Sequence, residues 1–225
     1  MAKTVVISLG GSLIHPNEVD IEFLKNFRKL IERFTLRGFR FVIYCGGGKL
    51  ARKMQDAASR ITKLENIDLD WLGIHATRLN AELVKTIFGK DAEDFLIVNP
   101  NDKIKFTKKI IVACGWLPGW STDFDAVLAA KNLGIKEIIN MSNVDYVYDK
   151  DPRKFKGAKK LGRVKWKEFR KLIDTKWHAG MNAPFDPIAA KEAEKIKTRV
   201  NFIGKDLKNL EKLLEGKKFE GTVID

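Results

Sequence analysis

Glycine-rich turns at the ends of three short apolar runs are the residues of this sequence best suited to chemistry. The runs and their turns are Val5–Leu9 before Gly10-Gly11-Ser12, Phe39–Tyr44 before Cys45-Gly46-Gly47-Gly48-Lys49, and Ile110–Cys114 before the residues from Gly115 to Asp123. Glycine allows backbone amides to approach a phosphate closely, and a helix that follows adds the positive end of its dipole. A tight turn needs glycine for steric reasons too, so one such turn is a weak signal. Three of them together favour a site for phosphorylated ligands.

The spacing of these glycines matches neither of the familiar phosphate-binding patterns. The sequence has no G-x-x-x-x-G-K-[ST] segment, and no G-x-G-x-x-G segment follows the first apolar run. This excludes a P-loop enzyme and a standard dinucleotide-binding protein. Several separate turns instead favour two phosphorylated ligands held face to face, which is the geometry that phosphoryl transfer requires.

The elements that must position these turns follow from the apolar pattern. Strands are predicted at Val5–Leu9, Phe39–Tyr44, Phe95–Val98, Ile110–Cys114, Glu137–Met141 and Val200–Ile203. Helices are predicted from Asp20, as N-cap, to a stop at Gly38, and at Lys49–Ser59, Leu69–Phe88, Asp123–Leu133, Asp186–Lys197 and Leu207–Leu214. Apolar strands that alternate with helices indicate a parallel sheet covered on both faces. Ligands of such sheets bind beyond the carboxyl ends of the strands, so the three turns are expected along one edge.

The charge and composition of the chain restrict its partners. Its 225 residues contain 42 Lys and Arg against 29 Asp and Glu, a formal net charge of +13. This excess attracts polyanions, which include nucleic acids, anionic membranes and phosphorylated metabolites. No apolar run approaches the roughly 20 residues that a membrane-spanning helix needs. We expect a cytoplasmic protein that binds phosphorylated small molecules and has neither a nucleic-acid partner nor a membrane partner.

Several other residues have ordinary structural explanations. Cys45 and Cys114 end apolar strands and are expected to be buried thiols, because two cysteines are too few for a disulfide framework or a zinc site. The three histidines are scattered without the spacing of metal ligands. The basic, weakly periodic stretch from Lys150 to Lys167 is expected to be a surface excursion within a single domain.

Beyond these patterns, the sequence resembles the amino acid kinase superfamily, and within it the archaeal-type uridylate (UMP) kinases. The segments that carry the resemblance are Gly10-Gly11-Ser12, Gly46 to Arg52, Asp70-Trp71-Leu72-Gly73-Ile74, Thr77-Arg78-Leu79-Asn80-Ala81, Pro118 to Asp123, Asn143-Val144-Asp145 with Tyr148, Asp151 and Pro152, Phe185 to Ala190, and Gly221-Thr222-Val223-Ile224. They occur in family order and span nearly the whole chain, so together they are far more specific than any one of them.

The resemblance implies a fold, an activity and an assembly. The fold would be one domain over residues 1–225, a three-layer α/β/α sandwich with a mainly parallel sheet. Its N-terminal lobe, about residues 1–135, would bind the monophosphate, and its C-terminal lobe, about residues 136–225, would bind ATP. The activity would be phosphoryl transfer from ATP to UMP in pyrimidine nucleotide biosynthesis, with Mg²⁺ carried by the ATP phosphates. The assembly would be a hexamer built as a trimer of dimers.

The same resemblance implies roles for individual residues. Those that would contact UMP are Gly47, Asp70, Trp116, Leu117, Pro118, Gly119, Trp120, Ser121 and Thr122, with Asp70 on the ribose. Those that would contact ATP are Gly11, Ser12, Gly48 and Arg52 at the transferring phosphates, and Ser142, Asn143, Tyr148 and Asp151 at the nucleoside. Asp186 and Arg52 would be the catalytic pair.

Local chemistry is compatible with these roles and also offers simpler ones. Arg52 lies one helical turn after the third glycine, so its guanidinium can return to a phosphate held by the backbone amides. Asp186-Pro187 is a routine helix opening, with an N-cap and a proline at the first helical position. Thr122 and Asp123 lie at a predicted helix start, where capping is their usual function.

Two residues depart from the family pattern. Many superfamily members have a lysine two residues before the first Gly-Gly, whereas this chain has Ser8, so the cationic role would pass to Arg52, Lys49 or another lysine. Tyr146 stands where the Asn-Val-Asp segment of the family usually continues with glycine, and a bulky residue there could narrow the ATP pocket.

The leading interpretation is therefore a UMP kinase, and three alternatives remain. One is a superfamily kinase for another small phosphorylated substrate; isopentenyl phosphate kinase is disfavoured because Cys45 replaces the histidine expected before the glycine triplet. A second is a non-catalytic nucleotide-binding or storage protein on the same fold, which Ser8 and Tyr146 would favour. A third is a nucleic-acid binder driven by charge, which would leave the glycine turns unexplained.

Overall fold

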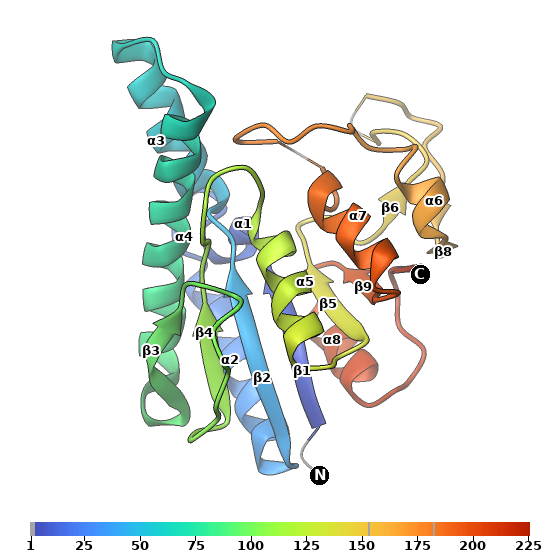
Figure 1. Ribbon diagram of the computed structural model, residues 1–225. Coiled ribbons are helices and arrows are strands. Elements are labelled where there is room, and N and C mark those ends of the chain that lie inside the picture. The colour runs from blue at the N-terminus through green and yellow to red at the C-terminus, as the bar shows by residue number, and fades with distance from the viewer. Residues whose placement is uncertain (1–2, 153, 182) are drawn as a thin grey trace.

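One eight-stranded sheet forms the centre of the protein in the computed structural model, which describes residues 3–152, 154–181 and 183–225 (Figure 1). Its strand order is β3-β4-β2-β1-β5-β9-β10-β8, and β6 and β7 form a separate two-stranded sheet. The strands are β1 Lys3–Leu9, β2 Phe39–Cys45, β3 Ala92–Ile97, β4 Ile110–Ala113, β5 Glu137–Met141, β6 Val147–Tyr148, β7 Lys160–Leu161, β8 Arg163–Val164, β9 Arg199–Ile203 and β10 Thr222–Ile224. In the central sheet β10 is antiparallel to β9, and every other neighbouring pair is parallel.

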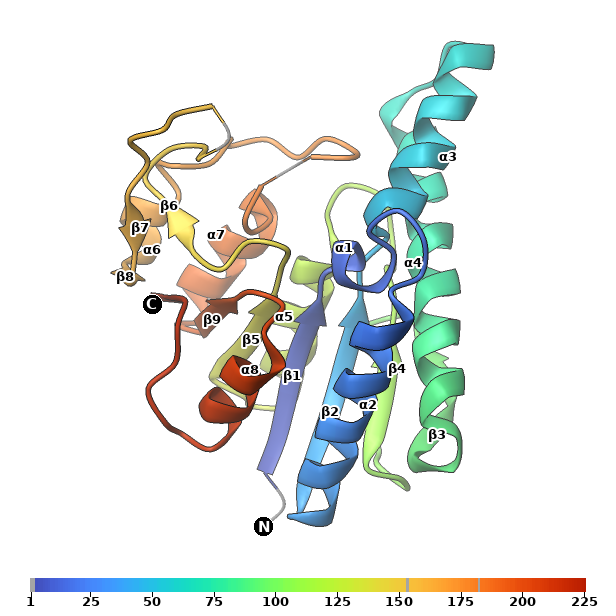
Figure 2. The same cartoon turned by 180° about the vertical axis from the view of Figure 1, so that it is seen from behind.

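Helices cover both faces of this sheet, which gives the three layers that the sequence predicts. They are α1 Gly11–Ile14, α2 Ile21–Leu36, α3 Gly48–Ile61, α4 Asn66–Phe88, α5 Thr122–Asn132, α6 Trp166–Phe169, α7 Pro187–Lys195 and α8 Leu207–Leu214, with a 3₁₀ turn at Gly89–Asp91. Figure 1 shows α5 and α7 in front of the sheet, and Figure 2 shows α2 and α8 on the opposite face. The predicted α/β/α fold class is confirmed.

The strands alternate their apolar side chains between two separate cores. In β1, Val6 packs with α5, α6 and α7, whereas Val5 and Ile7 pack with α2, α4 and α8. The same alternation continues in β2, where Val42 and Tyr44 lie on the first side and Phe41 and Ile43 on the second. A continuous apolar run is thus the signature of a strand buried on both faces.

Local signals in the sequence account for where the helices begin and end. The Asp20 carboxylate accepts the Phe23 N–H at 3.0 Å and caps α2, as predicted. After α2 the chain turns at Gly38, whose φ of +89° lies in the region that favours glycine. Asp186 caps α7 in the same way, as predicted, whereas α5 is capped by Ser121 rather than by Thr122 or Asp123.

The strand predictions are correct for the central strands and incomplete at the edges. β3 begins at Ala92 rather than Phe95, and β6, β7, β8 and β10, each two or three residues long, were not predicted from periodicity. The excursion from Lys150 to Lys167 is not wholly peripheral, because β8 pairs with β10 at the edge of the central sheet. The partner strand, β10, was expected only as part of Gly221–Ile224, one of the segments that carry the family resemblance. So short an element gives too few alternating positions to produce a pattern.

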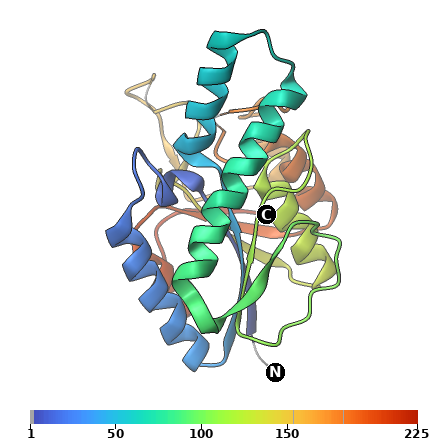
Figure 3. The same ribbon diagram turned by 90° about the vertical axis from the view of Figure 1, so that its left-hand side faces the viewer.

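The helices α3 and α4 form a hairpin that extends past the carboxyl edge of the sheet (Figure 3). Ala51 is the one buried residue of α3, whereas the second half of α4 packs into the core through Ala81, Val84 and Phe88. Neither these helices nor any other helix in the described ranges is long and apolar enough to cross a membrane.

Candidate active site

The turns after β1 and β2 are in direct backbone contact at the carboxyl edge of the sheet. A Cβ atom added to Gly11 would lie 2.2 Å from the Gly48 nitrogen, and one added to Gly48 would lie 2.2 Å from the Gly11 carbonyl oxygen. Gly48 also has a φ of +61°. The side-chain amide of Asn80, on α4, donates to the carbonyl of Gly46 at 2.8 Å and holds the turn after β2 in place. Glycine is therefore required here so that the two turns can approach each other.

A cavity of about 130 Å³ lies beside these turns. Its walls come from the second glycine turn, from α3 and α4, from the 115–122 segment and from the chain near Trp177. The lining residues are Gly47, Gly48, Ala51, Arg52, Gln55, Asp70, Gly73, Ile74, Thr77, Gly115, Trp116, Leu117, Trp120, Ser121, Thr122, Trp177, Gly180 and Met181. Three indole rings and one arginine in the same walls suit a ligand that has both a flat ring and a negative charge.

The Asp70 carboxylate, expected on a ribose, is already engaged by the protein. It is 8 % exposed, and it accepts the Gly119 N–H at 2.8 Å and the Trp177 indole N–H at 3.2 and 3.3 Å. A ribose hydroxyl could still use its remaining lone pairs or replace the indole. Trp177 was not predicted as a site residue, since it lies in a segment without periodicity.

A second cavity, of about 600 Å³, lies in the C-terminal half of the chain. Four of its lining residues are the predicted nucleoside contacts Ser142, Asn143, Tyr148 and Asp151. Tyr146 also lines it, and Lys150, Lys154 and Lys171 add positive charge. Met181 lines both cavities, so the two are neighbours. This volume falls within the range of pockets for drug-sized ligands.

The predicted ATP contacts do not all share this second cavity. Gly48 and Arg52 line the smaller cavity with the predicted UMP contacts, and Gly11 and Ser12 line neither. Among the predicted UMP contacts, Pro118 and Gly119 are absent from the walls; Gly119 instead supports Asp70 through its backbone. The remaining UMP contacts lie together. The contacts predicted for the two ligands are thus distributed over two neighbouring cavities.

Three aspartates of α5 and α7 form a carboxyl cluster behind the 115–122 segment. Asp123 accepts the Ser8 hydroxyl at 2.7 Å and the Asn140 amide at 2.8 Å. Burial, helped by the neighbouring charge of Asp186, raises the pKa of Asp123 to about 6 and that of Asp125 to about 7. Within the described ranges, no lysine, arginine or histidine forms an ion pair with any of the three.

Asp186 links this cluster to the wall of the smaller cavity. One of its oxygens accepts the N–H groups of Ile188 and Ala189 at 2.6 and 3.2 Å and caps α7. The other oxygen accepts the Ser121 N–H at 2.5 Å. Burial raises the pKa of Asp186, while these hydrogen bonds oppose the shift. The carboxylate thus holds the start of two helices, α5 and α7, in one position.

The cations nearest the glycine turns belong to α3. Arg52 is exposed, lines the smaller cavity and forms no ion pair with any described residue. Lys49 donates to the Asn17 side chain, and Lys53 donates to the Asn17 carbonyl at 3.0 Å. Of these three cations, Arg52 is the one that lines the smaller cavity and has no hydrogen bond or ion pair to a described residue.

The donor set does not form a ready metal site. No group of three or more His, Cys, Asp or Glu side chains within residues 3–152, 154–181 and 183–225 is arranged to hold a metal ion. Oxygens of Asp123, Asp125 and Asp186 accept internal hydrogen bonds instead. A divalent ion would depend on phosphate oxygens for most of its ligands, as Mg²⁺ commonly does.

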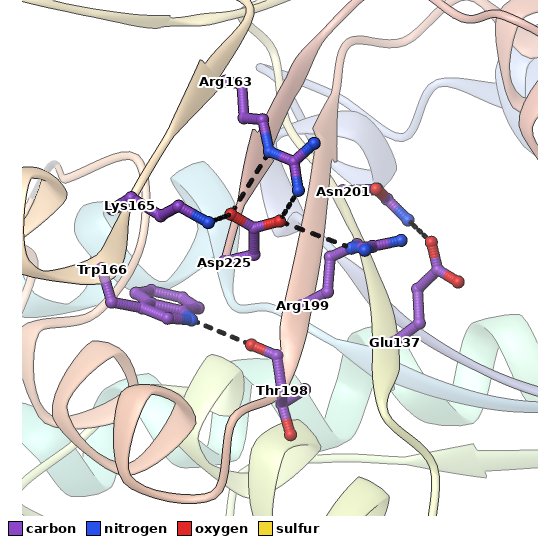
Figure 4. Close-up of polar contacts among 8 residues, drawn as sticks. All are labelled: Glu137, Arg163, Lys165, Trp166, Thr198, Arg199, Asn201 and Asp225. Carbon is purple, nitrogen blue, oxygen red and sulfur yellow. Dashed lines mark hydrogen bonds and ion pairs between the residues drawn. The ribbon is translucent and has the colours of Figure 1, made fainter.

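A third cavity lies at the opposite, amino edge of β5 and β9. A network of ion pairs and hydrogen bonds surrounds it (Figure 4). There the Asp225 carboxylate is shared by Arg163, Lys165 and Arg199, and these ion pairs hold its pKa below the usual range. The network joins the last residue of the sequence to β8 and β9. It lies outside the catalytic geometry described above.

Several contacts that matter at the site were missed by reasoning from sequence. Asn80 and Ser8 contact the site through bonds to segments 34 and 115 residues away along the chain. Asp125 was not singled out, and an acidic residue in the first turn of a helix is common. Cys45 and Cys114 were predicted as buried thiols, and both are fully buried and free.

A mainly parallel α/β/α sandwich has two glycine turns in contact beside two adjoining cavities. This arrangement suits a protein that brings two phosphorylated ligands together. The chain belongs to the amino acid kinase family, whose sequence model matches residues 3–201.

Relatives extend this assignment over the whole chain. It is 35 % identical over 227 residues to a uridylate kinase of Thermoplasma acidophilum, covering 100 % of this chain and 98 % of the relative. It is also similar to the crystal structure of uridylate kinase from Archaeoglobus fulgidus, with a TM-score of 0.82, 32 % identity and coverage of 99 % and 100 %. The UMP kinase structure from Bacillus anthracis, with a TM-score of 0.76 and 18 % identity, shares the fold.

Proposed function

We propose that this protein transfers the γ-phosphoryl group of ATP to UMP and releases UDP and ADP. The observation that carries the proposal is the contact between the turns at Gly11 and Gly48 beside a cavity that contains most of the predicted monophosphate contacts. The relatives that cover the whole chain are named uridylate kinases, which supports the same reaction. In that reaction an oxygen of the UMP phosphate attacks the γ-phosphorus as the bond to the ADP oxygen breaks.

The N-terminal lobe, about residues 1–135, would hold UMP. The proposal assigns the base to the walls at Trp116 and Trp120, the ribose to Asp70, and the phosphate to Gly47 and the start of α5. A helix start favours a negative charge, and the indole faces can pack against a pyrimidine ring. The cavity, at about 130 Å³, must widen to admit a nucleotide, because pockets for ligands of that size are usually at least about 300 Å³.

The C-terminal lobe, about residues 136–225, would hold ATP in the larger cavity. Ser142, Asn143 and Asp151 offer hydrogen-bonding groups to a nucleoside, and Tyr148 offers an aromatic surface. Tyr146 does not close this cavity: it lines the wall, and Lys160 lies 4.7 Å from the centre of its ring. The departure at this position is thus compatible with nucleotide binding.

Phosphoryl transfer requires positive potential and in-line alignment at the transfer point. The proposal assigns the alignment to the backbone amides of Gly11, Ser12 and Gly48, and the positive charge to Arg52. Mg²⁺ would enter on the ATP phosphates and neutralise part of their charge. Ser8 cannot supply charge, and its hydroxyl instead bonds Asp123. Asp186 would act by holding Ser121 and α7 in place, because its oxygens accept backbone N–H groups.

The setting of the reaction is part of the proposal. A UMP kinase belongs to pyrimidine nucleotide biosynthesis, and we place it in the cytoplasm as a hexamer, a trimer of dimers. Exposed apolar side chains on the α3–α4 hairpin, among them Ile61 at 85 % and Leu79 at 62 % exposure, support burial against another copy. Light scattering on the purified protein would measure the assembly.

The test is a time course of nucleoside diphosphate formation from ATP, Mg²⁺ and each of UMP, dUMP and CMP in turn. We expect UDP formation with UMP and a loss of at least about a hundredfold in the Arg52→Ala control. Binding of both nucleotides without UDP above that control would favour the non-catalytic alternative. Turnover of another phosphorylated substrate in place of UMP would favour a different kinase of the family.

A further inference from the structure

Asp125 accepts hydrogen bonds from Trp116 and Trp120, two tryptophans that line the smaller cavity. Its Oδ2 atom accepts the Trp116 backbone N–H at 3.2 Å, and its Oδ1 atom accepts the Trp120 indole N–H at 2.9 Å. The carboxylate is 1 % exposed, so both bonds are made in a dry environment. Each oxygen therefore has a separate donor from the 116–120 segment.

This carboxylate holds the Trp120 indole and the Trp116 backbone beside a group of aromatic rings. The Trp116 and Trp120 rings lie 6.0 Å apart, and the Trp120 ring lies 5.0 Å from that of Phe124. Both indoles line the smaller cavity, whereas Asp125 itself does not. It can thus influence a ligand there only through the two tryptophans.

We propose that Asp125 is a positioning residue for the acceptor nucleotide: its ionised carboxylate sets the Trp116–Trp120 wall against which the base packs. The inference rests on the proposed function, since it concerns the UMP pocket. An ionised carboxylate accepts both bonds. A protonated one carries a hydrogen on one oxygen and must weaken one of them, because both partners are donors.

The groups that face Asp125 determine when it loses its proton. Burial, together with the negative charges of Asp186 and Asp123, raises its pKa to about 7, and the bonds from Trp120 and Trp116 oppose this shift. Tyr44 and Cys114 also face it, and burial raises the pKa of each above an ordinary value that already exceeds neutrality, so both stay uncharged. No cation in the described part of the chain forms an ion pair with it. The wall is consequently expected to be best ordered above neutral pH.

Asp125 also has an ordinary structural role, because an acidic residue in the first turn of a helix stabilises that helix. A purely structural role predicts a lower melting temperature for any variant, with no selective effect on UMP. A positioning role predicts a selective loss of UMP affinity that depends on Trp120. The two can be separated by a double-mutant cycle.

The experiment measures the KM values for UMP and ATP, kcat and the melting temperature for wild type, Asp125→Asn, Trp120→Phe and the double variant. An asparagine at this position accepts on one side only, and phenylalanine keeps a ring without a donor. We expect Asp125→Asn to raise the UMP KM by about tenfold at pH 8 while the ATP KM changes less than about threefold. The double variant should be no weaker than Asp125→Asn alone.

The pH profile gives a second readout. Between pH 8 and pH 6 the wild-type UMP affinity should fall more steeply than that of Asp125→Asn. UMP itself titrates near pH 6, so the difference between the two proteins is the quantity of interest. If Asp125→Asn fails to fold, the same comparison is made with Trp120→Phe, whose profile should also be flatter than that of wild type.

Glu93→Gln is the matched control. Glu93 is 4 % exposed and ties a loop through the N–H groups of Thr107 and Lys108, both at 2.6 Å, without lining either of the two cavities. The Glu93→Gln variant should have a lower melting temperature and an unchanged UMP KM. Two outcomes would overturn the inference. One is an unchanged UMP KM in Asp125→Asn, and the other is a double variant whose loss of UMP affinity is the sum of the losses in the two single variants. A wild-type protein that does not bind UMP would overturn the proposed function instead.

Discussion

At the scale of single residues, the site depends on two backbones approaching more closely than side chains permit. Gly11 and Gly48 each lack room for a Cβ atom because the other turn occupies that space. Ser8, Asn80 and Asp125 then hold the surrounding segments by hydrogen bonds from buried positions. The chemistry therefore requires both close approach and a rigid support.

Replacement of Gly48 by alanine should damage the site more than its local strain suggests. A positive φ alone costs about 1 kcal/mol in an alanine, and the contact with the Gly11 carbonyl adds displacement of the first turn. We expect kcat to fall at least about tenfold along with the melting temperature. Gly216→Ala is the control, since Gly216 has a φ of +71° and open space around its Cβ position. If both variants lose stability and neither loses kcat, the close approach of the two turns is irrelevant to catalysis.

Replacement of Arg52 by alanine should slow turnover and leave stability intact. The side chain is exposed and forms no ion pair with a described residue, so little folding energy depends on it. Charge that develops on the transferring phosphoryl would lose its partner, at a cost of about a hundredfold or more in kcat. Arg60→Ala, on the same helix and paired with Asp56 at 2.9 Å, is the control. An effect confined to the ATP KM would make Arg52 a binding residue only.

At the scale of elements, single carboxylates hold together helices and loops that lie far apart in the sequence. Asp186 joins the cap of α7 to the start of α5, and Asp70 joins α4 to the 115–122 segment. Such links place the two proposed nucleotide sites on one rigid support. They bridge segments that are 65 and 49 residues apart in the sequence.

Replacement of Asp186 by alanine should act on stability and on UMP binding together. The N–H groups of Ile188, Ala189 and Ser121 would lose their acceptor, which we expect to cost about 1–3 kcal/mol of unfolding free energy. The Asp206→Ala variant removes the N-cap of α8, which accepts the Lys208 N–H at 2.9 Å, and serves as a control without a link to the site. Denaturant unfolding and UMP titration measure both effects. Equal effects of the two variants on UMP affinity would show that Asp186 is only a cap.

The sequence was sufficient for the elements with strong patterns and insufficient for contacts between distant segments. The long strands, the helix from Leu207 to Leu214 and the cap at Asp20 follow from periodicity and local hydrogen bonding. The bonds of Ser8 to Asp123 and of Trp177 to Asp70 depend on how the chain folds back on itself, which no local pattern encodes. The two- and three-residue strands exist because the neighbouring backbone offers hydrogen bonds, so their own residues carry little signal.

At the scale of the whole molecule, the buried carboxyl groups of the site and the ion-paired carboxylates of the surface have opposite effects on how stability depends on pH. Asp123 and Asp125 have pKa values raised to about 6 and about 7 by burial. Asp225 and Glu215, in contrast, have pKa values lowered by hydrogen bonds from cationic partners. The first pair destabilises the folded state when it ionises, and the second pair stabilises it when ionised.

The unfolding free energy should therefore be greatest at about pH 4 and decline toward neutral pH. As pH rises from about 4 to 7, the unfolded chain releases protons that folded Asp123 and Asp125 retain, so stability falls by on the order of a few kcal/mol. As pH falls below about 4, the stabilisation from Asp225 and Glu215 is lost. Urea unfolding at constant salt from pH 4 to pH 8 measures this curve, and Asp125→Asn should decline less between pH 5 and 7. A wild-type stability that rises steadily from pH 5 to pH 7.5 would contradict it.

The place of β10 in the sheet has a consequence for the order in which the protein can fold. Val223 and Ile224 pair with Arg163 and Val164 on one side and with β9 on the other, so β10 is inserted between two strands that are made earlier. During synthesis β8 thus has no neighbour in the central sheet until about sixty further residues have followed it. Pairings between such distant segments form slowly, because loop closure must precede the contacts that reward it. We expect the first five strands to collapse early, and the C-terminal edge to be the last part of the sheet to close.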